Sequence, residues 1–294
     1  MSATVLGPPA TSTALRQAYE WCRAYARRRQ ENFTVVSWFL PAELRPHFFA
    51  LYAFCRWTDD LGDEAPGDRL ALLDAWEREL RDCFDGRRER PLFVALGATI
   101  DRYGIPPEPF LRLIEANRMD QRVTRFETYG DLLRYCERSA TPVGRMVLAV
   151  LGYRDEERGR LADATCVGLQ LANFWQDVSV DLRKGRVYIP QEDLRRFGYS
   201  EEELRRGVVN EAFREMMRFE VGRARALFRE GRALEALVDR RARVDVRLFR
   251  LGGEATLDAI EAANYDVLTQ RPRVPRWKKA WLAASNGMRM KLGL

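Results

Sequence analysis

The stretch FFALYAFCRWTDDLGDE (residues 48–64) combines aromatic and aliphatic side chains with several carboxylates, and it decides the predicted fold. Its apolar residues follow helical spacing, so the stretch is predicted to form a largely buried helix. Polar side chains recur on that helix at intervals of three and four and therefore share one face. We call this set the first stripe, and its members are Tyr52, Arg56, Asp59, Asp60 and Asp63. Because buried carboxylates require cations, the stripe is predicted to face a shared positive ion.

The segment VGLQLANFWQDVSVDLRKGRVYIP (167–190) carries a second stripe of the same kind. Its polar members, again three or four residues apart, are Gln170, Asn173, Asp177 and Asp181. Most other positions are aliphatic or aromatic, so this helix is also predicted to be interior. If both helices are interior, the two stripes are expected to face each other across a cavity. Oxygen ligands of this kind suit Mg²⁺, which proteins usually hold with one or two carboxylates, water and phosphate oxygens.

Basic side chains accompany both stripes. Arg56 belongs to the first, and Arg183, Lys184 and Arg186 follow the second in a loop placed to close over a phosphate group. A solvated helix face explains either stripe alone equally well, and basic loop residues are often merely solvated. Two stripes on otherwise apolar helices, each followed by turn residues, favour a site for metal and diphosphate.

Helical periodicity extends along almost the whole chain. Glycine and proline separate the segments, and Gly252-Gly253 is predicted to break the last pair of helices. The predicted helices cover 12–30, 42–62, 67–84, 91–103, 107–122, 129–150, 155–180, 201–231, 233–251 and 253–269. The sequence contains no visible repeat, flexible linker or glycine-rich phosphate loop, which excludes solenoids and Walker-type or Rossmann sites. One all-α domain over 1–294 is therefore predicted.

The 294 residues carry 49 Lys and Arg against 43 Asp and Glu, a net charge of +6. Residues 271–294, which we call the basic tail, hold seven of the basic side chains and no acidic one, so the remainder is almost neutral. This distribution and the lack of a recognition motif argue against a nucleic-acid partner. Because the tail also contains Trp277 and Trp281, it suits contact with an anionic bilayer surface. The alternative is a packed helix whose first Lys and Arg bind diphosphate.

The cysteines, the histidine and the hydropathy of the sequence limit the possible metal sites, catalytic groups and cellular location. Five cysteines stand singly, which predicts reduced packing residues without disulfides. His47 is the single histidine and is predicted to pack or cap a helix, which leaves one candidate at most for a Ser-His-Asp triad and argues against a Cys/His zinc site. No apolar run reaches the roughly 18–20 residues of a membrane-spanning helix, and the first residues lack the pattern of a secretory signal. A cytoplasmic protein is expected, with the basic tail as an optional contact to the inner face of the membrane.

The paired motifs DDLGD (59–63) and DVSVD (177–181) resemble those of the squalene/phytoene synthase family, and the resemblance covers about residues 20–280. It implies an all-α isoprenoid synthase fold with a central cavity, in which a cluster of Mg²⁺ ions, or of Mn²⁺, holds diphosphate. The metal ligands implied are Asp59, Asp60, Asp63, Asp177 and Asp181. Asp120, in the stretch RMDQRVTRF, matches a further acidic position of the family.

Four segments resemble one subgroup, the bacterial hydroxysqualene synthases of hopanoid biosynthesis: ENFTVVSWFLP (31–41), YCERSATPVGR (135–145), ANFWQDVSVD (172–181) and VLTQRPRVPRWKKA (267–280). Gln176 stands where phytoene synthases and other squalene synthases usually carry Arg, and Pro142 replaces a small residue of theirs. Thr141 departs from the Asn expected in the subgroup. Losing that Arg weakens one diphosphate contact, which favours a substrate with a single diphosphate.

The resemblance implies Mg²⁺-dependent conversion of presqualene diphosphate and water to hydroxysqualene, with release of diphosphate and without NADPH. The implied catalytic residues are Tyr52, Arg56, Tyr135, Gln170 and Asn173, and the implied diphosphate ligands are Ser37, Arg56, Asn173, Lys184, Arg186 and Tyr265. Squalene synthase, phytoene synthase, presqualene diphosphate synthase and terpene cyclase activities stay open, as does a non-catalytic helical lipid-binding protein. The oligomeric state is not predicted.

Overall fold

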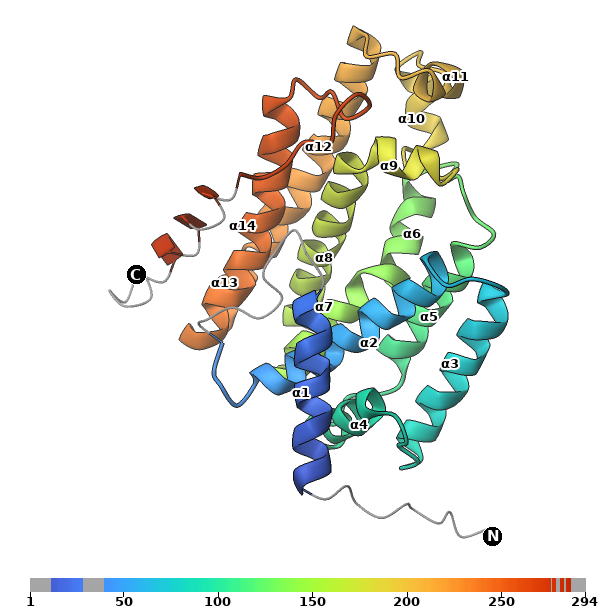
Figure 1. Cartoon of the computed structure of the whole chain (residues 1–294). Coiled ribbons are helices and arrows are strands. Elements are labelled where there is room, and N and C mark those ends of the chain that lie inside the picture. Colours follow the sequence, from blue (N-terminus) through green and yellow to red (C-terminus); the bar gives the residue numbers. More distant parts are fainter. Residues whose placement is uncertain (1–11, 29–39, 276, 279–280, 283, 287–294) are drawn as a thin grey trace. The chain divides into compact units, whose positions relative to one another are not determined.

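The computed structural model describes residues 12–28, 40–275, 277–278, 281–282 and 284–286. Every regular element in this part of the chain is a helix (Figure 1), which confirms the all-α prediction. The helices are α1 (Ser12–Arg28), α2 (Arg45–Asp63), α3 (Arg69–Phe84), α4 (Pro91–Tyr103), α5 (Glu108–Met119), α6 (Tyr129–Ser139), α7 (Thr141–Val150), α8 (Glu156–Gln176), α9 (Val178–Arg183), α10 (Gln191–Arg196), α11 (Glu201–Arg205), α12 (Glu211–Gly231), α13 (Leu234–Leu237) and α14 (Arg240–Ala262).

Two predicted helices are each divided in the structure. The helix predicted over 129–150 is interrupted at Ala140 (φ −120°, ψ −50°), which separates α6 from α7. The helix predicted over 155–180 ends at Gln176, and Asp177 (φ −104°, ψ 14°) separates α8 from α9. The second interruption falls on an aspartate of the second stripe, so its carboxylate sits at a helix junction instead of within a regular turn.

The helix predicted over 201–231 is also divided, because each of its parts has a side-chain cap of its own. The Ser200 hydroxyl accepts from the backbone N–H of Glu203 at 3.2 Å at the start of α11. The Asn210 side chain accepts from the backbone N–H of Phe213 at 2.9 Å at the start of α12. The short helix α10 was not predicted, since six residues are too few to show a clear period.

The predicted break at Gly252-Gly253 is wrong, because α14 runs through both residues. A Cβ atom on Gly253 would lie 2.3 Å from Phe228 of α12 and 2.8 Å from Leu169 of α8. The missing side chain therefore allows close packing of α14 on these two helices. Burial of Phe228 at this contact offsets the cost of about 1 kcal/mol that glycine brings to a helix interior.

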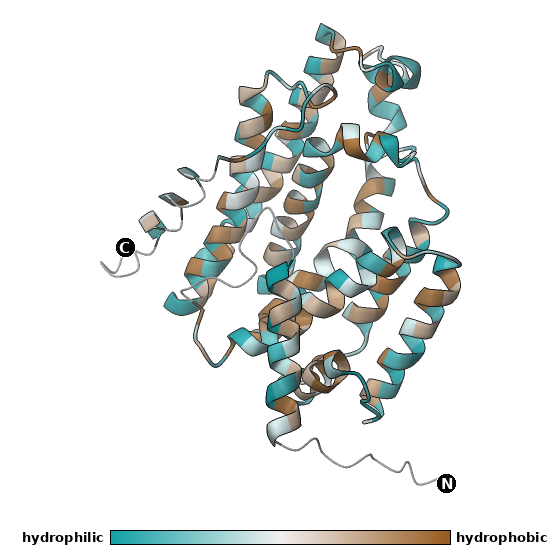
Figure 2. Cartoon of the chain, in the orientation of Figure 1, coloured by the Kyte–Doolittle hydropathy of each residue, from teal (hydrophilic) through white to brown (hydrophobic). Residues whose placement is uncertain are grey.

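The described residues cluster into two compact units. Among the described residues, the first unit holds those up to Arg122 together with Pro142–Glu156, and the second holds Val123–Thr141 and those from Glu157 onward. The first stripe belongs to the first unit and the second stripe to the second unit. Hydrophobic and hydrophilic residues interleave along the helices of both units, as expected for amphipathic helices (Figure 2).

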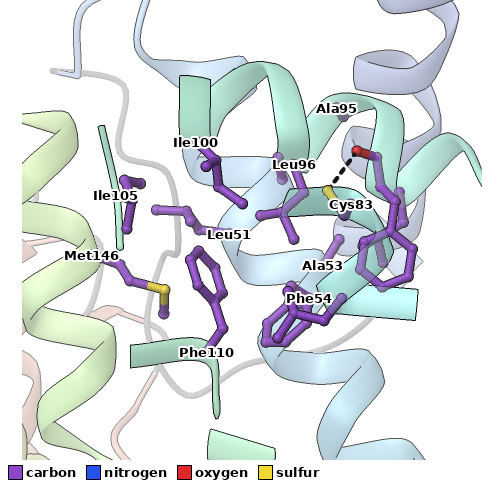
Figure 3. Packing of buried hydrophobic residues seen from close by; sticks show 14 of the residues in the cluster. Leu51, Ala53, Phe54, Cys83, Ala95, Leu96, Ile100, Ile105, Phe110 and Met146 are labelled. Carbon is purple, nitrogen blue, oxygen red and sulfur yellow. Dashed lines mark hydrogen bonds between the residues drawn. The ribbon is translucent and has the colours of Figure 1, made fainter. Parts of the chain in front are cut away.

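Aromatic side chains fill the core of the first unit. Figure 3 shows Phe54 of α2 beside Phe110 of α5, and the two rings meet edge to face with centroids 5.1 Å apart. Trp76 of α3 stacks on Phe54 at 5.6 Å, and its indole N–H donates to Thr58 Oγ1 at 2.9 Å. This burial fixes the rotation of α2 about its axis, so the polar first stripe has to lie on another side of the helix.

Histidine and cysteine have the packing roles predicted for them. His47 is buried, with Nδ1 at 3.0 Å from Thr99 Oγ1 and 3.1 Å from the Tyr19 hydroxyl. Burial lowers the pKa of His47 to about 4, so the imidazole is neutral at physiological pH. None of the five cysteines forms a disulfide.

A buried charge cluster joins α10 to α12 in the second unit. Arg223 donates from Nη1 to Asp193 and, at 3.1 Å, to Glu220 Oε1, while both carboxyl groups are almost fully buried. Burial raises the pKa of Glu220 to about 8; the Arg223 charge opposes that shift and the Asp193 charge adds to it. One guanidinium thus balances one carboxylate, and Glu220 holds its proton at neutral pH.

This cluster predicts that stability falls as the pH rises from the ordinary pKa of a glutamate, 4.5, to the pKa of about 8 that Glu220 has in the folded chain. A carboxyl group whose pKa is raised on folding favours the folded state while it is protonated, and that advantage is lost as pH rises toward the folded pKa. Between about pH 7 and pH 8 we expect the free energy of unfolding to fall by about 1 kcal/mol through Glu220 alone. Denaturant titrations of Glu220→Gln should show a flatter pH dependence, because its amide cannot ionise. Glu215→Gln, on the exposed side of α12, is the control and should behave like the native chain. An equally steep profile for Glu220→Gln would contradict this account.

Candidate functional site

Asp59 of the first stripe lies beside α5. Asn117 Nδ2 donates to Asp59 Oδ1 at 3.3 Å, and Gln121 Nε2 donates to the Gly62 carbonyl at 2.9 Å. A Cβ atom on Gly62 would lie only 2.2 Å from Asn117 Oδ1. The glycine in DDLGD therefore lets α5 approach α2 closely enough to place its polar side chains at the first stripe.

The surroundings of Asp59 disfavour its charged form. Removal from bulk water raises its pKa to about 7, the Asn117 hydrogen bond and the Arg56 charge oppose that shift, and the charges of Asp63 and Asp120 add to it. Asp59 is nevertheless exposed at the surface, so a ligand can reach it. Three carboxyl groups from α2 and the end of α5 thus repel one another, and an added cation would stabilise their charged forms.

Asp60 points away from this group, toward α1. Its Oδ2 accepts from the Tyr25 hydroxyl at 2.6 Å, and its Oδ1 lies 2.9 Å from Arg56 Nη2. Arg56 also pairs with Glu64 at 2.9 Å. The first stripe is therefore divided: Asp59 faces α5, whereas Asp60 and Arg56 bind each other. Tyr52 lies one turn before Arg56 on α2 and is half-buried.

The second stripe is the accessible strip of a helix that is otherwise buried. In the C-terminal half of α8 the half-exposed positions are Cys166, Leu169, Gln170 and Asn173. The positions between them, including Leu171, Phe174 and Trp175, are buried. The prediction that this helix is interior and presents one polar stripe is confirmed.

Arg271 covers the first aspartate of the second stripe. Its Nε donates to Asp177 Oδ1, and its Nη2 donates to Asp177 Oδ2 at 2.9 Å. The bond to Asp177 raises the pKa of Arg271, and the charges of Asp177 and Asp181 add to this shift. A guanidinium therefore sits within the electrostatic field of both aspartates of the second motif.

The loop after the second motif is anchored at several points. Val187 N–H donates to the Thr124 carbonyl at 2.9 Å, and Arg125 Nη1 donates to the Gly185 carbonyl at 2.6 Å. Tyr188 stacks on Phe174 with ring centroids 3.7 Å apart. The anchors leave the loop's cations accessible, with Arg183 and Lys184 exposed and Arg186 half-exposed.

The other predicted residues have varied settings. Tyr135 is buried against Phe126, with ring centroids 5.3 Å apart. Tyr265 has a positive φ of 59° and lies under the Arg218 guanidinium at 5.2 Å. Ser37 lies outside the described residues. The reaction roles predicted for Tyr135 and Tyr265 stay predictions.

Several neighbours of the stripes were missed by the sequence analysis. Asp120 and Gln121 follow Asn117 by three and four residues, so the rule that found the two stripes would have found a third at the end of α5. Arg271 was placed only in the basic tail, because the irregular backbone after α14 has no period that would relate it to Asp177.

The carboxylates do not form a complete metal site by themselves. Among the described residues, no three Asp, Glu, His or Cys side chains are grouped to hold a metal ion. The repulsion around Asp59 nevertheless fits a hard cation that receives its remaining ligands from water and phosphate. A small pocket lined by Asp181 and Tyr188 has a volume of about 10 Å³, far below the roughly 300–1,000 Å³ of typical ligand sites.

Aspartate-bearing stripes on two separate helices of an all-α chain are typical of isoprenoid diphosphate synthases. The chain belongs to the squalene/phytoene synthase family, whose model matches residues 26–278. A solved squalene synthase HpnC from Alicyclobacillus acidocaldarius is 51% identical, with a TM-score of 0.83 over 87% of this chain and 97% of that chain. A solved dehydrosqualene synthase in complex with ligand is 25% identical, with a TM-score of 0.87 over 95% of this chain and 99% of that chain.

Relatives with other names are also similar. The 15-cis-phytoene synthase of Synechococcus elongatus is 36% identical over 286 residues, which cover 92% of this chain and 93% of the relative. The family and these relatives confirm the isoprenoid synthase fold and show that the chain is an enzyme of this class. Among the described residues, no helix has the length and apolar character needed to cross a membrane.

Proposed function

We propose that this enzyme converts presqualene diphosphate and water to hydroxysqualene and diphosphate. The observation that carries the proposal is Gln176, which stands where phytoene synthases usually carry a diphosphate-binding Arg. The side chain is buried and donates to the Pro272 carbonyl at 2.7 Å, so it presents no cation to a second diphosphate. The 51% identity with a squalene synthase HpnC supports the same choice. A head-to-head phytoene synthase is the second candidate, favoured by the names of other relatives.

We assign Mg²⁺, replaceable by Mn²⁺, to the carboxylates of the two motifs. Asp59 and Asp63 would hold it on the first stripe, and Asp177 and Asp181 on the second. When bound, Mg²⁺ neutralises the charge that develops on the leaving diphosphate. Asp60 supports this group indirectly, since its carboxylate is engaged by Arg56 and Tyr25.

The chain's own residues bind and orient the substrate. Lys184 and Arg186, in the anchored loop, supply positive charge to the diphosphate, and Gln170 and Asn173 offer amide hydrogen bonds from the half-exposed strip of α8. The carbon–oxygen bond to diphosphate breaks, and its electron pair leaves with diphosphate. The resulting carbocation rearranges; water then adds to it and loses a proton, which gives the alcohol. No hydride is consumed, so NADPH is not required.

Diphosphate release from three substrates tests this proposal. With Mg²⁺ and without NADPH, presqualene diphosphate should be consumed, whereas farnesyl and geranylgeranyl diphosphate should be poor substrates. Formation of phytoene from geranylgeranyl diphosphate would contradict the proposal and support the phytoene synthase activity instead.

We also propose that the basic tail contacts an anionic bilayer. Trp277 and Trp281 are 71% and 61% exposed, and Val143, at 36%, is the only other large apolar side chain exposed among the described residues. Among the described residues of the tail, 277–278, 281–282 and 284–286 are helical, and both indoles belong to these helical residues. Other described residues of the tail are engaged with the protein, because Lys278 pairs with Asp258 at 2.9 Å and Asn286 is buried. Exposed indoles with surrounding positive charge fit the headgroup region of an anionic membrane.

Vesicle sedimentation of the full chain tests this contact. Trp277→Ala combined with Trp281→Ala should lower binding to phosphatidylglycerol-containing vesicles by about tenfold. The double variant lacks the two indoles that are expected to insert into the lipid headgroup region. Val143→Ala is the matched control and should bind like the native chain. Equal vesicle binding by all three proteins would contradict the proposal. So would a dimer that forms without lipid in the native chain but not in the variant lacking both indoles.

A further inference from the structure

The Arg271–Asp177 ion pair puts a cation of the protein where the proposed function requires a metal. Both carboxylate oxygens of Asp177 accept from the same guanidinium, and the exposed fractions of the Arg271 and Asp177 side chains are 32% and 24%. Bidentate pairs of this kind are among the stronger charge-assisted hydrogen bonds. A metal ion that binds Asp177 must therefore displace Arg271 from at least one oxygen.

The backbone that carries Arg271 is held in place from the same end of α8. The Gln176 side chain is 1% exposed, and its Nε2 donates to the Pro272 carbonyl at 2.7 Å. Gln176 thus binds Pro272 and Asp177 binds Arg271, so the two short segments pair in antiparallel order. The Gln176 amide fixes the backbone next to Arg271. This restricts the positions that the Arg271 guanidinium can reach and keeps it close to Asp177.

We propose that Arg271 is a built-in competitor of the metal for Asp177, and that Gln176 is the positioning residue that keeps it there. This inference rests on the proposed function for the identity of the metal site. Without substrate, the guanidinium neutralises Asp177 and keeps its affinity for divalent cations low. A diphosphate brings competing anionic oxygens to the guanidinium, so Asp177 becomes available when metal and substrate arrive together.

The charge distribution supports competition over simple structural pairing. Asp181 also lies within the electrostatic field of Arg271, so one guanidinium serves two aspartates of one motif. On the first stripe, by contrast, Asp59 has Asp63 and Asp120 as neighbours that add repulsion. A guanidinium occupies both oxygens of Asp177, whereas Asp59 Oδ1 accepts only from the neutral Asn117 amide at 3.3 Å, so a metal without diphosphate should bind more readily at the first stripe than at the second.

Mn²⁺ titration followed by electron paramagnetic resonance tests the competition without measuring turnover. In the substrate-free full chain, Arg271→Met should increase Mn²⁺ affinity at the weaker site by about tenfold, since a bidentate charged pair no longer competes. Gln176→Met should give a smaller increase in the same direction. Arg273→Met, a change of an exposed arginine two residues away, should leave the affinity unchanged.

A double substitution locates the effect at Asp177. In an Asp177→Asn background, Arg271→Met should produce no further change in Mn²⁺ affinity. Added inorganic diphosphate should reduce the difference between the native chain and Arg271→Met. Equal affinities of these two proteins, with circular dichroism showing both folded, would overturn the competition while leaving the proposed function intact. Failure of every variant to bind Mn²⁺, even with diphosphate, would overturn both.

Discussion

Asp59→Asn is expected to reduce turnover by about a thousandfold, which corresponds to roughly 4 kcal/mol of lost transition-state stabilisation. The amide keeps the size of the carboxylate, and its oxygen can still accept from Asn117 Nδ2. What the change removes is the negative charge that would hold a cation beside the leaving diphosphate. Steady-state release of diphosphate from presqualene diphosphate measures the effect.

The same substitution should not weaken the fold. The pKa of Asp59 is raised to about 7 because its charged form is disfavoured, so a neutral amide relieves repulsion from Asp63 and Asp120. We expect an unchanged or slightly higher melting temperature and native helical circular dichroism. Asp85→Asn, which alters an exposed aspartate at the end of α3 that pairs with Arg87 at 3.0 Å, is the control and should retain full activity. Retained turnover in folded Asp59→Asn would refute the metal assignment of the first stripe.

A second large effect is expected from removal of the metal. Excess EDTA should abolish the consumption of presqualene diphosphate, and added Mg²⁺ or Mn²⁺ should restore it, because the proposed metal neutralises the charge that develops on the leaving diphosphate. Omission of NADPH should leave the rate unchanged. Undiminished turnover in EDTA would show that the basic side chains alone release the diphosphate.

Helix periodicity predicted the second stripe well, because helical geometry sets which positions share a face. The strip Gln170–Asn173 on α8 is the accessible part of an otherwise buried helix, as expected. The same reasoning was too coarse for Asp59 and Asp60. Adjacent residues point about 100° apart around a helix, and here one faces α5 and the other faces α1.

Features that depend on tertiary contacts could not be predicted in this way. Gly252-Gly253 suggested a break, yet Gly253 is required by the approach of Phe228, which lies far away in sequence. The pairing of Arg271 with Asp177 joins residues 94 positions apart across irregular backbone. Gln176 was recognised only as a departure from the family pattern, and its bond to Pro272 required the folded chain.

The most direct test of the proposed function is the fate of labelled water. The purified full chain is incubated with presqualene diphosphate and Mg²⁺ in H₂¹⁸O, without NADPH, and the products are identified by mass spectrometry. We predict hydroxysqualene that carries ¹⁸O in its hydroxyl group, together with one diphosphate per product molecule. Squalene, phytoene, a cyclised hydrocarbon or unchanged substrate would contradict the account.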